Sequence, residues 1–158
     1  MEKKLKLLGV EKAEKIILRK VKPLKGKEKI DIKDSFGRVL ISSLNSKRNQ
    51  PGLDLSAMDG YAVRKKDLSS LPKKLELVGE IKAGDRISKA IKKNQTFRIF
   101  TGAPIPNGAN KVIIQENCLE DGKEVLIKRE NKETYIRKKS HDISKKFILK
   151  APKLISTR

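Results

Sequence analysis

The sequence predicts an α+β chain that is mostly β: an N-terminal amphipathic helix, an elongated β-rich linker unit, and an inserted small β-barrel-like domain. Two observations lead to this fold class. Apolar residues recur at helical spacing near the N-terminus. From residue 60 onward, short β-branched or aliphatic runs alternate with clusters of Pro, Gly, Asn and Asp, a pattern typical of a small all-β unit.

The first element is an expected helix near the N-terminus. Its apolar residues follow the i, i+3, i+7, i+11 spacing of one helical stripe, with Lys and Glu on the other faces: Val10, Ala13, Ile17 and Val21. Gly9 marks the start of this helix, and Pro23 is expected to end it. The stripe must be covered by another element, in this chain or beyond it.

The next stretch predicts short local structure. Residues from Lys27 to Ile32 alternate polar and apolar, which favours a short strand. Asp34 or Ser35 can cap a short helix that runs through Leu40. Residues 44–52 are polar and end in Pro-Gly, so we expect a crossing loop there.

The remaining elements are expected strands. Their apolar runs are 61–63, 75–78, 97–100, 112–114, 125–127, 135–137 and 147–149. Turn residues at 83–85 and 120–122 separate some of them. We therefore expect three parts: residues 1–26 as the helix, residues 54–132 as an inserted β domain, and residues 27–50 plus 133–158 as one discontinuous elongated unit.

Composition narrows the function classes. The formal net charge is +20, from 39 basic and 19 acidic residues, which attracts polyanions. The lysines are spread along the chain without stacking aromatics or a nucleic-acid-binding motif, so a nucleic-acid binder is only a secondary alternative. No apolar run approaches the roughly 20 residues of a membrane span. One cysteine, with an N-terminal apolar stretch too short for a secretory signal, favours the cytoplasm.

Two stretches carry the chemistry. Asp59 precedes a glycine, so a turn can present its carboxylate at the end of a strand. Residues 101–109 form a Pro- and Gly-rich loop in which Thr101 offers a hydroxyl and nearby N–H groups could bind an oxyanion. Asp59 and Asp142 together would suit Mg²⁺. Each stretch also fits a plain turn or rigid connection, while His141 and Cys118 are more typical of surface and incidental residues.

The order of several motifs resembles the MoeA family of molybdopterin molybdenumtransferases, whose animal counterpart is the E domain of gephyrin. The motifs are Phe36-Gly-Arg-Val-Leu40, Pro51-Gly-Leu-Asp54, Ser56-Ala-Met-Asp-Gly-Tyr-Ala-Val63, Gly79-Glu-Ile-Lys-Ala-Gly84, Arg98-Ile-Phe-Thr-Gly-Ala-Pro-Ile-Pro-Asn-Gly-Ala109 and Val112-Ile-Ile-Gln-Glu116. Their common order and spacing extend over nearly the whole chain. This makes the resemblance far more specific than any one motif.

The resemblance implies the last step of molybdenum cofactor synthesis. The family inserts molybdate into adenylylated molybdopterin, with Mg²⁺ and release of AMP. Its members are elongated homodimers whose active site lies between the pterin-binding α/β domain of one subunit and the inserted β domain of the other. The resemblance places catalytic roles on Asp59, Thr101 and Asp142, and a metal-binding role on the two aspartates. It places substrate-binding roles on Ser56, Met58, Gly60, Tyr61, Gly102, Ala103, Pro104 and Glu116.

The chain also departs from the family pattern. Ser140-His141 stands where the family has Gly-Glu before Asp142, and serine resists backbone angles that glycine accepts. The family continues into an α/β domain with a glycine-rich, acidic pterin site and a further small β domain, which this sequence does not contain. We therefore expect the chain to be incomplete as a catalyst. A non-catalytic dimerisation or interaction module is the main alternative.

Overall fold

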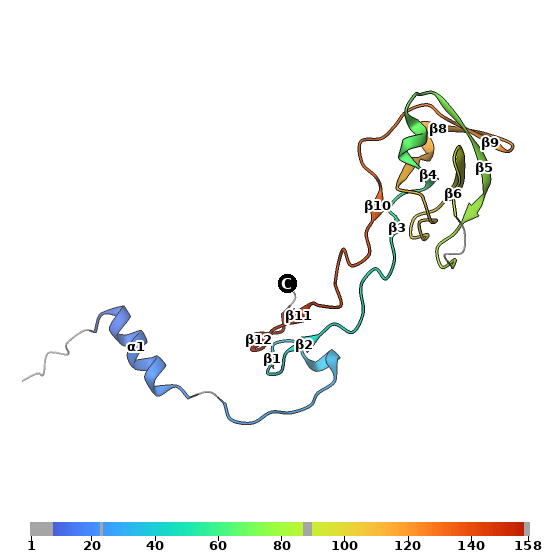
Figure 1. Cartoon of the computed structure of the whole chain (residues 1–158). Helices are drawn as coiled ribbons and strands as arrows, with labels where there is room; N and C mark the ends of the chain where they lie inside the picture. Colours follow the sequence, from blue (N-terminus) through green and yellow to red (C-terminus); the bar gives the residue numbers. More distant parts are fainter. Residues whose placement is uncertain (1–7, 23, 87–89, 157–158) are drawn as a thin grey trace, which may run out of the picture. The chain divides into compact units, whose positions relative to one another are not determined.

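The structure is a computed structural model that describes residues 8–22, 24–86 and 90–156 (Figure 1). Pro23, expected to end the first helix, lies outside the described residues. The chain divides into two compact units. One unit contains the residues up to Ser42 together with those from Ala151 onward, and the other runs from Ser43 to Lys150. No helix among the described residues is long and apolar enough to cross a membrane.

Helix α1 spans Val10–Lys20 and confirms the expected helix. Glu11 in its first turn and two basic residues in its last turn complement the helix dipole. None of its side chains is buried. Its apolar stripe is exposed, with exposed fractions of 84% for Val10 and 58% for Ile17. The cover that the pattern calls for is therefore not supplied by the described part of the chain.

The rest of the first unit corrects two expectations. A short 3-10 helix, η1, spans Ile32–Asp34, and Asp31 caps it by accepting a hydrogen bond of 3.2 Å from the backbone N–H of Lys33. Residues 27–31 form no strand, because no described segment pairs with them and the Asp31 side chain favours a tight turn. The predicted helix capped by Asp34 or Ser35 is also wrong. Its last residues form strand β1 (Val39–Leu40), antiparallel to β12 (Lys153–Leu154).

In the second unit, two short ladders pair the segment that precedes the central sheet with the segment that follows it. Strand β2 (Leu44–Asn45) pairs with β11 (Ile148–Leu149), and β3 (Leu55–Ser56) pairs with β10 (Ile136–Arg137). Strands β10 and β11 confirm two predicted strands. Strand β2 lies where a loop was expected, because it forms by pairing with the distant strand β11, and no local pattern predicts that pairing.

The centre of this unit is a curled six-stranded sheet (Figure 1). Its strands are β4 (Gly60–Val63), β5 (Lys73–Ile81), β6 (Gln95–Ile99), β7 (Lys111–Ile114), β8 (Cys118–Asp121) and β9 (Glu124–Ile127). The order is β7-β4-β6-β5-β9-β8, and only β5 and β6 run parallel. Within the described residues no ladder joins the edge strands β7 and β8, so the curled sheet is a half-barrel. The five strands predicted in this region are present, and β8 was missed.

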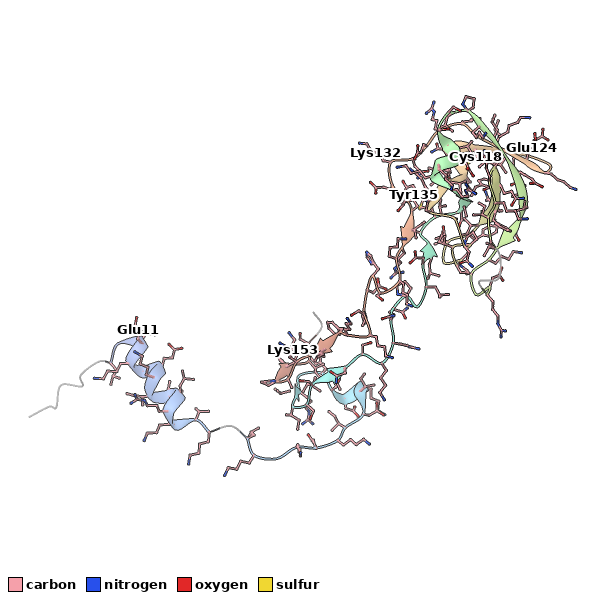
Figure 2. All side chains as sticks on the ribbon, in the orientation of Figure 1. Glu11, Cys118, Glu124, Lys132, Tyr135 and Lys153 are labelled. Carbon is pink, nitrogen blue, oxygen red and sulfur yellow. The ribbon has the colours of Figure 1, made fainter. Side chains whose placement is uncertain are left out.

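Apolar clusters cover both faces of the curled sheet. Successive residues of β4 enter different clusters because side chains alternate along a strand: Tyr61 and Val63 join one, and Ala62 joins the other. Cys118, labelled in Figure 2, packs with the first cluster. The fully buried side chains are mainly Ile, Val and Leu, as the scarcity of aromatic residues predicts.

The outer edge of β7 is covered by the segment that leaves β9. Asn131 accepts a hydrogen bond of 3.3 Å from the N–H of Ile114 and donates one of 3.1 Å to the carbonyl of Val112. Lys111 is 2% exposed, and its Nζ lies 2.6 Å from Oε1 of Glu130. These bonds satisfy an edge that would otherwise present unpaired backbone groups.

Candidate functional site

Asp59 and Thr101 meet where two neighbouring strands come together. The pairing of Gly60 with Ile99 aligns the start of β4 with the end of β6. Oδ1 of Asp59 accepts two hydrogen bonds from Thr101, at 2.7 Å from the backbone N–H and 2.9 Å from the hydroxyl. The Asp59 carbonyl accepts a third from the N–H of Gln115 at 3.2 Å. Two of the three predicted catalytic residues are therefore in direct contact.

The surroundings of Asp59 favour its ionised form. The backbone N–H of Thr101, then its hydroxyl, and the charge of Arg98 outweigh partial burial and hold the pKa of Asp59 below its ordinary value of 3.8. Oδ2 of Asp59 accepts no hydrogen bond from any described residue. The site therefore presents one fixed carboxylate with an oxygen available to a ligand.

Glycines make the close approach of these segments possible. A Cβ added to Gly60 would lie 2.0 Å from the carbonyl oxygen of Ile113 on the neighbouring strand, so only glycine fits between β6 and β7 at this point. Gly102 has a φ of +82°, and its N–H donates to the Ser56 carbonyl at 2.9 Å. A left-handed residue of this kind turns the chain directly after Thr101.

Several predicted substrate-binding residues form the framework of this turn. Ala103 and Pro104 are buried, and Ala103 exchanges backbone hydrogen bonds with Ser56 and Phe100. The Ser56 hydroxyl donates to the carbonyl of Met58 at 2.6 Å. The Met58 side chain is 39% exposed, so in this group Met58 offers the accessible side chain.

Tyr61 and Glu116 differ in their access to solvent. Tyr61 is 3% exposed, and its hydroxyl donates to Oε2 of Glu120 on β8. Burial and that hydrogen bond raise the pKa of Tyr61 to about 12. Glu116 is exposed on the short helix η3 (Gln115–Asn117). Glu116 is therefore the more accessible of the two to a ligand.

Asp142 has its own set of partners. It pairs with the guanidinium of Arg137, and its Oδ1 lies 3.1 Å from Nδ1 of His141. The hydrogen bonds from Arg137 and then His141 hold its pKa below the ordinary range. Ser140 adopts a φ of +67°, the left-handed angle that serine was expected to resist. Asp59 and Asp142 thus belong to separate hydrogen-bonded groups.

The available His, Cys, Asp and Glu side chains limit how this chain could bind a metal ion. No three His, Cys, Asp or Glu side chains gather into a metal-binding group within the described ranges. Asp59 offers one unengaged carboxylate oxygen, and Mg²⁺ is commonly held by one or two carboxylates together with water and substrate phosphates. The residues present therefore fit Mg²⁺ shared with a phosphate-bearing ligand, and do not fit a metal held by this chain's side chains alone.

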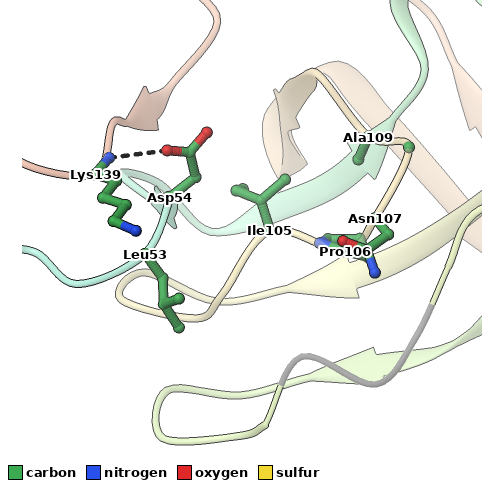
Figure 3. A pocket seen from close by; sticks show the side chains of 8 residues that line it. Leu53, Asp54, Ile105, Pro106, Asn107, Ala109 and Lys139 are labelled. Carbon is green, nitrogen blue, oxygen red and sulfur yellow. Dashed lines mark hydrogen bonds between the residues drawn. The ribbon is translucent and has the colours of Figure 1, made fainter.

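A shallow pocket of about 320 Å³ lies along the other end of the 101–109 loop (Figure 3). Its lining includes Leu53, Asp54, Ile105 and Lys139. Oδ1 of Asp54 accepts from the Lys139 N–H at 2.8 Å, and Oδ2 from Nζ of Lys138 at 2.7 Å. These bonds join the segment before β3, at Asp54, to the segment after β10, at residues 138–139.

Arg98 is the residue of this region that sequence reasoning passed over. It lies opposite Tyr61 in the β4–β6 ladder. Its guanidinium carbon is 4.9 Å from the centre of the Tyr61 ring and 5.3 Å from that of Phe100. The sequence signal that could have identified Arg98 is its position as the first residue of the motif that contains Thr101.

The comparisons with known proteins all point to the same family. The model of the MoeA N-terminal region (domains I and II) matches residues 8–158. A molybdopterin molybdenumtransferase of Nostoc is 39% identical over 104 residues, covering 63% of this chain and 24% of the relative. That of Haemophilus influenzae is 35% identical over 121 residues, covering 75% and 30%. The crystal structure of a molybdopterin biosynthesis MoeA protein from Pyrococcus horikoshii superposes with a TM-score of 0.71 at 28% identity, covering 96% and 40%. The chain thus spans well under half the length of these relatives.

Proposed function

The chain belongs to the MoeA family as its N-terminal region, and on this basis we propose that it is the N-terminal part of a molybdopterin molybdenumtransferase. The proposed reaction inserts molybdate into adenylylated molybdopterin and releases AMP. This chain contributes Asp59 and Thr101 to a shared active site, and it is catalytically incomplete by itself. We also keep the three-part division at residues 1–26, 27–50 with 133–158, and 54–132 as part of the proposal.

The observation that carries the proposal is the bond pair between Asp59 and Thr101. Both donors of Thr101 fix one carboxylate oxygen and leave the other available. A carboxylate held in this way costs no reorganisation when a charged ligand arrives, which is how preorganised polar groups contribute to catalysis. Asp59 would hold Mg²⁺ together with the phosphate of the adenylylated substrate. Mg²⁺ bound there would neutralise charge that develops on the phosphate as AMP leaves.

The rest of the site is proposed to come from outside this chain. The pterin-binding α/β domain would supply the pocket for the substrate. In the proposed homodimer, that domain would belong to the other subunit. Asp142 would act at the same cleft, where its pairing with Arg137 keeps it ionised. Glu116 and Met58, both exposed, would contact the substrate.

Reconstitution tests this proposal. The chain is mixed with the separately expressed remaining domains of a family member, adenylylated molybdopterin, Mg²⁺ and molybdate, and AMP release is assayed. We expect release only when both proteins are present. Asp59→Asn should lower the rate by about 100-fold, the effect typical of losing one charge-stabilising group in an active site.

Asp121→Asn serves as the matched control, because this aspartate lies on an exposed position of β8. It should leave the rate unchanged. AMP release that is equally fast with Asp59→Asn would contradict the assigned role of Asp59. A correctly folded chain that yields no AMP with a competent partner would contradict the proposed reaction.

The second candidate is a non-catalytic interaction module, and the exposed apolar stripe of α1 is the observation that favours it. Val10 and Ile17 are largely exposed although their spacing marks a contact face. Sedimentation of the chain with and without the remaining domains separates the two functions. A stable complex without AMP release would favour the module, whereas a complex that turns over would favour the enzyme.

A further inference from the structure

Five side chains share one face of the sheet at the Asp59 end. Arg98 and Tyr61 are directly opposite each other in the ladder. Because side chains alternate along a strand, Asp59 and Phe100 extend the same face by one step. Diagonal neighbours in such a ladder lie about 7–8 Å apart, which brings Arg98 close to Asp59. Gln115 joins the group from the end of β7, where its N–H donates to the Asp59 carbonyl.

The guanidinium of Arg98 is held in place from three sides. It stacks over the rings of Tyr61 and Phe100, at 4.9 and 5.3 Å to their centres. Its NH2 group donates to Oε1 of Gln115 at 2.5 Å. Stacked arginine is pre-organised, so it loses less freedom when it binds a further partner.

The charge of Arg98 is not neutralised by an ion pair. Arg38, Arg64 and Arg137 each meet a carboxylate, but no ion pair within the described ranges includes Arg98. Its side-chain hydrogen bonds go to the neutral amide of Gln115 and to the Tyr61 hydroxyl, and neither of these groups neutralises its charge. A guanidinium has five N–H donors in a planar fork. Donors that match an oxyanion therefore remain available beside the Asp59–Thr101 pair.

We propose that Arg98 is a further ligand-binding residue of the Asp59–Thr101 site, where its guanidinium contacts a tetrahedral oxyanion of the ligand. The inference rests on the proposed function, because it adds a contact to the same site. Arginine binds such groups through paired N–H donors. The oxyanion is either the phosphate of an adenylate or a free inorganic oxyanion, since both present the same tetrahedral oxygens. The same positive charge helps to hold the pKa of Asp59 low.

Direct binding to the full chain tests this contact. Backbone and arginine side-chain NMR signals are followed while AMP, inorganic phosphate or molybdate is added, in separate titrations. We expect saturable shifts at Arg98, Thr101 and Gln115. Arg98→Gln should weaken binding by about tenfold or more, because a hydrogen bond to a charged group commonly contributes a factor of this size. Arg129→Gln, after β9, is the matched control and should bind like the unaltered chain.

Two further variants keep the test independent of folding. Arg98→Lys retains the charge without the fork and should give an intermediate affinity. Phe100→Leu retains the guanidinium without one stacking ring and should also weaken binding. Tighter binding of AMP than of phosphate or molybdate identifies the adenylate phosphate, and the opposite order identifies a free oxyanion.

The proposal is overturned if Arg98→Gln binds as tightly as the unaltered chain with its sheet signals unchanged. It is equally overturned if none of the three probes shifts Arg98. These outcomes differ from a failure of the proposed reaction. Saturable binding without AMP release in reconstitution leaves the contact intact and removes the reaction. AMP release that Arg98→Gln does not slow keeps the reaction and removes the contact.

Discussion

Thr101 gives both of its hydrogen-bond donors to one oxygen of Asp59. The backbone N–H lies 2.7 Å from Oδ1 and the hydroxyl lies 2.9 Å from it. Two bonds to a single oxygen fix the carboxylate relative to the end of β6. The negative charge of the group is thus kept at one position, and its second oxygen accepts no hydrogen bond from the described residues.

Thr101→Val tests this relationship, because it removes the hydroxyl but keeps the backbone N–H and the β-branched shape. The pKa of Asp59 should rise toward its ordinary value of 3.8, since one of the two bonds that lower it is lost. An NMR titration of the Asp59 carboxyl carbon measures the change. Thr101→Ser keeps the hydroxyl and should leave the pKa low. An equal pKa in the valine and serine variants would show that the hydroxyl does not contribute.

The acid stability of the Ser43–Lys150 unit should depend on Asp54. Burial raises the pKa of Asp54, but hydrogen bonds from Lys138 and Lys139 lower it by more. A lowered folded pKa adds stability that is complete above the unfolded value of 3.8 and is lost as the pH falls through the folded value. We therefore expect the free energy of unfolding to decrease as the pH falls below about 4.

Asp54→Asn should flatten part of this acid limb, because an amide does not titrate. Denaturant unfolding at a series of pH values gives the measurement. Asp121→Asn, in an exposed position on β8, is the control and should keep the full pH dependence. A limb that is identical in Asp54→Asn and in the unaltered chain would rule out this assignment.

Gly60→Ala should be among the most damaging small substitutions in the sheet. The added Cβ would lie 2.0 Å from the Ile113 carbonyl oxygen, so β4 and β7 must separate. We expect a loss of about 3 kcal/mol in the free energy of unfolding, at the upper end for overpacking. Gly52→Ala meets nothing within 4 Å and should change stability by less than about 0.5 kcal/mol. Similar unfolding midpoints for the two variants would disprove the tight approach.

The helix and the longer strands of this fold could be predicted from the sequence. Helix α1 and the strands β4, β5, β6, β7 and β9 follow from local periodicity and turn residues. The short strands β1, β2, β3 and β12 were not predicted, because pairing with distant segments creates them and their own residues show no strand pattern. Strand β8 was hidden because its polar residues, Glu120 and Asp121, suit a turn as well as an exposed edge.

The candidate site likewise has residues that the sequence motifs identify and a residue whose role depends on the three-dimensional structure. Asp59 and Thr101 were identified from motif order, and the register of β4 against β6 joins them. Arg98 was not identified, because its stacking on Tyr61 and Phe100 depends on the register between strands β4 and β6. Charge and composition cannot reveal which of many basic residues is held in this way.

Ser140 provides a last test, because it has the backbone angle of a glycine. Its φ is +67° in the turn that leads to Asp142, where the His141 N–H donates to the Lys138 carbonyl at 3.0 Å. A left-handed angle costs an L-residue roughly 1–2 kcal/mol. The surrounding bonds, including one of 3.0 Å from the Ser140 N–H to the Pro51 carbonyl, hold it there.

Ser140→Gly should therefore stabilise the folded unit. Relief of the left-handed angle exceeds the extra chain entropy that glycine gains on unfolding, about 0.5–1 kcal/mol, so the net gain should be of order 0.5–1 kcal/mol. Denaturant unfolding measures it. Ser140→Ala keeps a side chain at the same angle and should bring no gain, which separates backbone relief from loss of the hydroxyl. If glycine and alanine give equal stability, relief of the left-handed angle does no more than offset the chain entropy of glycine, and the expected net gain is contradicted.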